Sequence, residues 1–169
     1  MVVEREKLTQ GGKANRQGKV LERTIVPTFE SYGFQVIPFR EWSQHQARFG
    51  DELLLKNVPY TTIYGHPGYT EFLLKSRRHN LEIRIECKWQ QSAGSVDEKL
   101  PYLYLNCLEA IPEKEIIIVT GGGGMKKGAI PWLKRSAENR LYVKETSSCK
   151  VIKVMLLEEF LLWVNNTFS

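Results

Sequence analysis

The sequence contains few cysteines, no long apolar run and no apolar N-terminal segment. Its three cysteines are an odd number without a C-x-x-C pair, and its three histidines have no metal-like spacing. A disulfide framework and a structural zinc site are therefore not expected. No apolar run approaches the roughly 18 residues of a membrane span, and the charged N-terminus lacks a signal-peptide pattern. We expect a cytoplasmic protein with reduced thiols and no membrane contact.

The composition is that of a globular protein with a basic surface. Apolar residues make up 42% and charged residues 25% of the 169 residues, enough for one domain with its own core. The net charge is +5, and basic residues are concentrated in residues 1–23 and 121–153. Two basic zones indicate a polyanionic partner, most simply nucleic acid. A merely soluble basic surface is the alternative.

The chain divides into a flexible basic arm at residues 1–17 and a single domain at residues 18–169. Strands and helices alternate after residue 80, which predicts a mixed sheet flanked by helices, whereas residues 40–50 are expected to be irregular. The predicted helices cover 18–33, 129–139 and 156–164, with a further helix after a capping box at 95–98. The predicted strands cover 34–39, 51–56, 59–64, 70–76, 81–88, 115–120 and 149–155.

The strands at 70–76 and 81–88 are predicted to form a hairpin in which opposing residue numbers sum to 157. This register pairs Phe72 with Ile85 on an apolar face. It also pairs Lys75 with Glu82, which carry opposite charges. A slip by one residue would spoil both faces, so the pattern favours this register.

The same register brings two acidic side chains together. Glu71 lies opposite Glu86, with Cβ atoms about 5 Å apart, and Lys88 follows two residues later on the same face. Two like charges at that separation are destabilising unless something compensates them. A divalent cation between the carboxylates would do so, and magnesium fits best because hard oxygen ligands are available there.

An acid on one strand, Glu71, followed by E-C-K at 86–88 on the next strand resembles the PD-(D/E)XK nuclease superfamily. The run ECKWQ at 86–90, followed by GSVDEK at 94–99, is similar to Holliday-junction resolvase-like and restriction-type enzymes. The resemblance covers about residues 15–120. It implies an α/β restriction-endonuclease-like core, with a central mixed β-sheet flanked by helices.

The first acid departs from the family pattern. It is Glu71 after Tyr-Thr, where the pattern has Asp after Pro. Asp51, which follows Gly50, is the competing first acid. Because Asp51 lies off the predicted hairpin, we rank it second.

The resemblance implies a chemical role for each residue of the motif. Glu71, Glu86 and the backbone carbonyl of Cys87 would bind Mg2+, or Mn2+ as a substitute. Lys88 would orient or deprotonate the attacking water and offset the phosphate charge. The Cys87 side chain points to the opposite, apolar face, so a nucleophilic cysteine is not expected.

Two further residues are drawn into the site by the same resemblance. Glu22, on the first helix, would act as a helper acid through a water or a second metal. Gln90 would position the phosphate or Lys88. The alternative to the whole assignment is a solvated strand face on which Lys88 and Arg84 neutralise Glu86.

Basic residues outside the motif are expected to contact the DNA backbone. The glycine run at 121–124 follows a strand and precedes a helix, which suits a phosphate-binding loop, although a flexible connection is the alternative. It matches no nucleotide-binding motif, so no nucleotide cofactor is expected. The expected DNA-binding residues are Lys13, Arg16, Lys19, Lys99, Lys126 and Lys127.

The expected function is magnesium-dependent hydrolysis of phosphodiester bonds in DNA by an endonuclease. A chain of 169 residues leaves no room for a separate recognition domain, so branched or junction DNA is one candidate substrate. Two symmetric cuts would need a homodimer. The alternatives are a small restriction-type or phage nicking nuclease, and a non-catalytic DNA-binding module with the nuclease fold.

Overall fold

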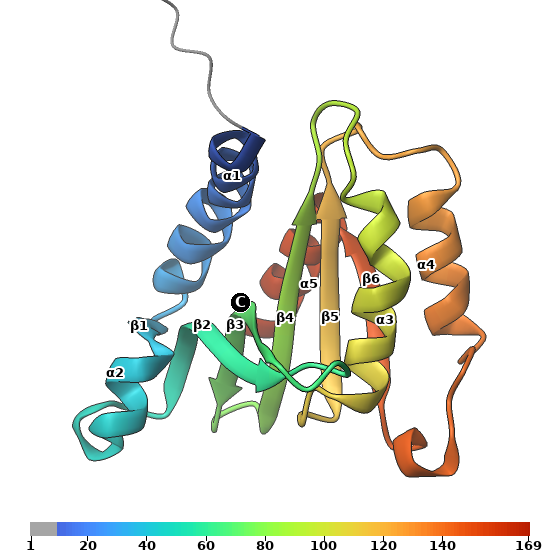
Figure 1. Cartoon of the computed structure of the whole chain (residues 1–169). Helices are drawn as coiled ribbons and strands as arrows, with labels where there is room; N and C mark the ends of the chain where they lie inside the picture. Colours follow the sequence, from blue (N-terminus) through green and yellow to red (C-terminus); the bar gives the residue numbers. More distant parts are fainter. Residues whose placement is uncertain (1–9) are drawn as a thin grey trace, which may run out of the picture.

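The computed structural model describes residues 10–169, with side chains from residue 19 onward, and a six-stranded sheet lies at its centre (Figure 1). The strands are β1 (Gln35–Pro38), β2 (Glu52–Thr61), β3 (Pro67–Ser76), β4 (Leu81–Trp89), β5 (Glu115–Gly121) and β6 (Val151–Leu156). They lie side by side in chain order. β1 is parallel to β2, β2 to β4 are antiparallel, and β4 to β6 are parallel. The predicted mixed sheet is confirmed, with the β3–β4 hairpin in its middle.

Helices cover both faces of this sheet. They are α1 (Gln10–Ser31), α2 (Phe39–Gln44), α3 (Leu100–Glu109), α4 (Ala129–Glu138) and α5 (Leu157–Phe168), with short 3-10 turns η1 (Gln46–Arg48), η2 (Asp97–Lys99) and η3 (Glu145–Ser147). Side chains of α1 and α5 share one buried cluster, and those of α3 and α4 share another. None of the helices in residues 10–169 has the length and apolar character needed to cross a membrane.

The alternation of side chains in the strands explains these two layers. Ile85 of β4 is fully buried in the same cluster as Ile25 of α1, and Ile118 of β5 is buried on the opposite side with α3 and α4. Successive residues of a strand point to opposite faces. β4 therefore presents an apolar face to α1 and α5, and it presents Glu86 and Lys88 on the face that α3 and α4 share.

The first helix is longer than the sequence pattern predicted. α1 begins at Gln10 rather than near Gly18, and Pro27 lies within it without dividing it. The periodicity argument could not find this start, because Ala14 is the one apolar side chain in residues 10–17 and marks no helical face. Residues 10–17 of the expected arm are therefore helical, and residues 1–9 lie outside the described part of the chain.

Three other local predictions were wrong. Residues 40–50, expected to be irregular, contain α2 and η1. The two short strands expected at 51–56 and 59–64 are one strand, because β2 continues through Pro59, which pairs with Tyr69 of β3. The capping box at Ser95 is absent, since the turn begins at Asp97 and the helix at Leu100 without a side-chain cap.

Candidate active site

The predicted hairpin register is confirmed. β3 pairs with β4 from Ser76 opposite Leu81 to Phe72 opposite Ile85, so the opposing residue numbers sum to 157. Beyond Phe72, β3 no longer pairs with β4 but stays paired with β2 as far as Pro67. The two central strands of the sheet therefore separate at the position of Glu71.

Glu71 occupies the point where the strands separate. Its Oε2 accepts a hydrogen bond from the backbone N–H of Cys87 on β4, at 2.7 Å. The backbone pairing of β3 with β4 thus ends at Phe72 and Ile85, one pair before the predicted Glu71–Glu86 pair. The Glu71 carboxylate, rather than a backbone carbonyl of β3, accepts the hydrogen bond from the Cys87 N–H. On the other side of β3, Asn57 of β2 has a left-handed φ of 54°. Asparagine tolerates this conformation better than most residues, and the distortion lies directly across β3 from the separation.

Glu86 is the buried acid of the pair. Its Oε1 accepts a hydrogen bond from the Nζ of Lys88. Its Oε2 is buried and has no hydrogen-bond partner among the described residues. A buried carboxylate oxygen without a partner is costly. It is also a hard ligand of the kind that Mg2+ prefers, so this carboxylate fits a divalent cation.

The charges of the three side chains are strongly coupled. Burial, and then the negative charge of Glu86, raise the pKa of Glu71 to about 8. Lys88 and the hydrogen bond from Cys87 act in the opposite direction without outweighing them. Burial alone would lower the pKa of Lys88, but the charges of Glu86 and Glu71 outweigh it and raise this pKa above its ordinary value. Near neutral pH the Glu71–Glu86 pair therefore holds one proton, and a cation is able to replace this proton.

Cys87 lies in the apolar layer, as its place in the strand predicts. The side chain is buried in the cluster formed with α1 and α5. Burial, followed by the charges of Glu71 and Glu86, raises the pKa of its thiol well above the ordinary value. A thiol that stays protonated at neutral pH is a poor nucleophile. Coordination of a metal by the Cys87 carbonyl stays a prediction.

The structure places Glu22 beside the cluster rather than in it. The Glu22 carboxylate forms an ion pair with Lys56 of β2. Its charge is close enough to contribute to the raised pKa of Cys87. Its part as a helper acid stays a prediction.

Gln90 has a structural part that the sequence analysis did not find. The side chain is buried, its Nε2 donates to the carbonyl of Gly124 at 2.9 Å, and its Oε1 accepts from the N–H of Val96 at 2.8 Å. Both ends of the amide are therefore engaged by backbone. Gln90 therefore positions the loops that follow β4 and β5, and its expected contact with the phosphate or with Lys88 stays a prediction.

The glycine run is used for close packing. A Cβ on Gly122 would lie 2.4 Å from the carbonyl oxygen of Gln90, and one on Gly124 would lie 2.6 Å from the backbone carbonyl carbon of Gln91. The N–H of Gly124 donates to the Gln90 carbonyl at 2.7 Å. Because the run packs on the loop after β4, it is not merely a flexible connection. Its contact with a phosphate stays a prediction.

Four of the expected DNA-binding residues have described side chains, and all are exposed: Lys19, Lys99, Lys126 and Lys127. Lys99 follows β4, Lys126 and Lys127 follow β5, and these loops lie at the same end of the molecule as the N-terminal half of α1 (Figure 1). Lys13 and Arg16 belong to α1, but their side chains lie outside the described part. One end of the sheet thus collects basic residues.

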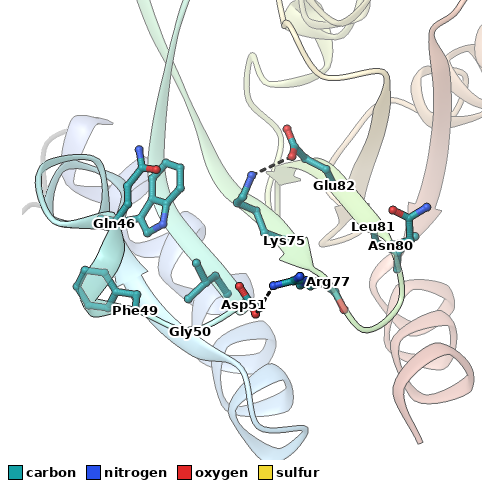
Figure 2. Close-up of a pocket in the computed structure, with 12 residues that line it drawn as sticks. Gln46, Phe49, Gly50, Asp51, Lys75, Arg77, Asn80, Leu81 and Glu82 are labelled. Carbon is teal, nitrogen blue, oxygen red and sulfur yellow. Dashed lines mark hydrogen bonds and ion pairs between the residues drawn. The ribbon is translucent and has the colours of Figure 1, made fainter.

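Asp51 does not compete for the site. Its Oδ2 lies 3.4 Å from Nη1 of Arg77. Figure 2 shows this pair in a pocket at the turn end of the β3–β4 hairpin. The adjacent residue Glu52 pairs with Ser76, five residues along β3 from Glu71. Of the two candidate first acids, only Glu71 lies beside Glu86.

A buried ion pair behind the site was not predicted. The alternative of a solvated strand face had Arg84 neutralise Glu86, but its guanidinium binds Glu113 through Nε at 2.7 Å and Nη2 at 3.1 Å. Its Nη1 donates to Thr70 Oγ1 at 3.2 Å. Arg84 is buried, so the pair forms part of the core that supports both strands. The only sequence signal was an arginine in a strand with buried neighbours.

Within residues 10–169, no group of three or more His, Cys, Asp or Glu side chains is arranged to hold a metal ion. The acidic ligands available at the strand separation are Glu71 and Glu86. A complete coordination shell would therefore need backbone, water or substrate oxygens, as is usual for Mg2+.

A six-stranded mixed sheet flanked by helices, with two carboxylates and a lysine where its central strands separate, defines a nuclease-like α/β protein. A family model described as a PD-(D/E)XK nuclease superfamily domain matches residues 13–168. The chain belongs to the PD-(D/E)XK nuclease superfamily. Comparisons with curated proteins and with solved structures gave no match.

Proposed function

We propose that this protein is a magnesium-dependent DNA endonuclease. Membership of the superfamily supports a nuclease that uses divalent metal ions. The observation that carries the proposal is the unpartnered, buried Oε2 of Glu86 beside Glu71 and Lys88. A retired site would have no reason to keep a buried acceptor next to a second acid.

The donor set suits a hard cation. Glu71, Glu86 and the Cys87 carbonyl would hold it, whereas the Cys87 thiol is buried in the apolar layer with α1 and α5. When bound, the cation supplies positive charge that stabilises the scissile phosphate. It also relieves the repulsion that raises the Glu71 pKa.

Lys88 acts as a fixed positive charge in this proposal. Its contact with Glu86 holds the ammonium in place, and its raised pKa keeps it protonated at neutral pH. The ammonium is therefore suited to orienting the attacking water and offsetting phosphate charge. Deprotonation of the water by Lys88 is less favourable, since a group that remains protonated is a poor general base.

The test compares nuclease activity with and without the metal. Supercoiled plasmid and four-way junction DNA are incubated with the protein in Mg2+ or in chelator. We expect nicked or resolved products only with Mg2+. Lys88→Ala should reduce the rate by about 100-fold or more and leave DNA binding largely intact. Lys75→Ala, at a lysine that pairs with Glu82 at 2.8 Å, is the matched control and should cleave as wild type.

Two outcomes would contradict the proposal. Cleavage at the wild-type rate by Lys88→Ala would show that this lysine takes no part in the reaction. DNA binding without cleavage in Mg2+ or Mn2+ would favour a non-catalytic DNA-binding module. The cut pattern on the junction separates junction resolution from nicking. Symmetric paired cuts would also require a homodimer, which sedimentation measures.

A further inference from the structure

The β2–β3 hairpin continues past the strand separation and lies across the face of the sheet that carries the acidic cluster. Arg84 of β4 donates to the carbonyls of Val58 and Pro59 in this extension, at 3.1 and 3.2 Å. The backbone N–H of Ile63 at its tip donates to the buried Asn106 of α3 at 2.9 Å. The extension is therefore held at its base and at its tip.

Tyrosines line this extension. Tyr64 at the tip is 72% exposed, yet its ring packs against that of Tyr102 of α3, with centroids 4.8 Å apart and planes tilted by 30°. The His66 ring lies beside it, with centroids 6.1 Å apart. Tyr69 on β3 is 57% exposed. One face of the Tyr64 ring is thus covered, while most of the side chain remains open to solvent.

The tyrosines adjoin the acidic cluster. Tyr69 is two residues before Glu71 on the same strand. At the base of the extension, Tyr60 packs so closely over Gly68 that a Cβ there would lie 3.0 Å from its ring. Burial, and then the charge of Glu86, raise the pKa of Tyr60 to about 12. Tyr60 and Tyr69 therefore bring the base of the aromatic extension next to the acidic cluster.

An exposed ring fixed in this way favours flat aromatic ligands. Bases inside a duplex already stack on their neighbours, whereas unpaired bases have free faces that stack on tyrosine. We propose that Tyr64, backed by Tyr102, stacks on an unpaired base of the DNA next to the cleaved phosphate, with Tyr69 supporting the adjacent nucleotide. This inference rests on the proposed nuclease function and specifies its substrate class as DNA with single-stranded nucleotides at the site.

The first test measures binding without cleavage. Fluorescence anisotropy in chelator and at fixed salt compares a single-stranded oligonucleotide, a blunt duplex and a fork with splayed strands. Tyr64→Leu should weaken binding to single-stranded and forked DNA by about 5- to 100-fold and change duplex binding by less than about twofold. Tyr64→Trp should retain the preference. Tyr142→Leu is the matched control, because Tyr142 is 62% exposed but lies in the loop between α4 and η3.

The second test separates stacking from a loss of hairpin structure. An abasic nucleotide is placed at successive unpaired positions of the fork. We expect one position at which it weakens wild-type binding but has little further effect on Tyr64→Leu. Independent, additive losses would overturn the proposal. So would an equal loss on duplex and forked DNA, or an equal loss from Tyr142→Leu.

The two proposals fail in different ways. If the wild-type protein prefers forked DNA in chelator but cleaves no DNA in Mg2+, the proposed base stacking stands and the proposed nuclease function fails. If the protein cleaves duplex and forked DNA alike, and Tyr64→Leu has no effect, the proposed nuclease function stands and the proposed base stacking fails.

Discussion

Glu71 of β3 accepts a hydrogen bond from the backbone N–H of Cys87 on β4 at 2.7 Å, one residue beyond the last pair of the two strands. This contact replaces the next backbone hydrogen bond of the ladder. It also holds the Glu71 carboxylate near Glu86, because the acceptor cannot turn away without leaving a buried N–H unpaired.

The pH dependence of stability should report this proximity. The pKa of Glu71 rises from 4.5 to about 8 on folding. Between these values the native state holds a proton that the unfolded state has lost, so the metal-free protein loses stability as pH rises through this window. Glu71→Gln keeps the acceptor and removes the charge. Thermal melts in chelator should show this variant more stable than wild type by about 4 kcal/mol at pH 9, with a smaller difference at pH 5.

Magnesium should reverse this order. The wild type should gain stability with Mg2+ and the Glu71→Gln variant should gain little, because it lacks one ligand. Glu82→Gln, at an exposed glutamate on the neighbouring strand β4, is the control and should respond to Mg2+ as wild type. Equal pH profiles for wild type and Glu71→Gln would show that Glu71 does not carry the raised pKa.

The buried ion pair predicts a large stability cost. Arg84→Met leaves Glu113 without its partner and removes the hydrogen bond to Thr70. Breaking one side of a buried pair costs about 3–5 kcal/mol. Arg77→Met, at an exposed pair with Asp51, should stay within about 1 kcal/mol of wild type. Chemical denaturation measures both variants, and similar small costs would mean that Arg84 is not a core support.

The glycine run predicts a steric effect at one position. Gly124→Ala would place a Cβ against the backbone of Gln91 and Ser92 and should destabilise the protein by about 1–3 kcal/mol. Gly128→Ala, where a Cβ meets no atom within 4 Å, should be neutral or slightly stabilising. Thermal melts distinguish these outcomes, and a neutral Gly124→Ala would contradict the packing of this run on the β4 loop.

Salt dependence tests the basic end of the molecule. If Lys126 and Lys127 each contact a phosphate, the slope of the logarithm of the DNA-binding constant against the logarithm of the salt concentration should be less negative by about 2 in the double alanine variant. Lys114→Ala is the control, because Lys114 is exposed next to the start of β5, at its other end. Anisotropy titrations over a salt series measure the slopes. Equal slopes for the double variant and wild type would exclude these lysines from the interface.

The sequence predicted the hairpin and its register because both depend on local pattern. The strict alternation of apolar and charged residues in β4 and the pairing of Lys75 with Glu82 are readable along the chain. The start of α1 was not readable, because its first turns carry no apolar stripe. The strand break expected near Pro59 was wrong because β2 tolerates a proline in its extension with β3.

The site residues were predictable to the extent that they share one strand pair. Glu71, Glu86 and Lys88 follow from the hairpin register. The part of Gln90 depends on Gly124 and Val96, and the pair between Arg84 and Glu113 spans 29 residues of sequence. Such contacts depend on tertiary packing between segments that no local periodicity connects.

The separation of β3 from β4 has an evolutionary consequence. Beyond Phe72 the β2–β3 ribbon pairs only with itself, and its tip contacts α3 rather than the rest of the sheet. Insertions, deletions or substitutions at that tip leave the register that aligns the two acids unchanged. The chemistry and the choice of substrate are therefore free to diverge independently within one small domain.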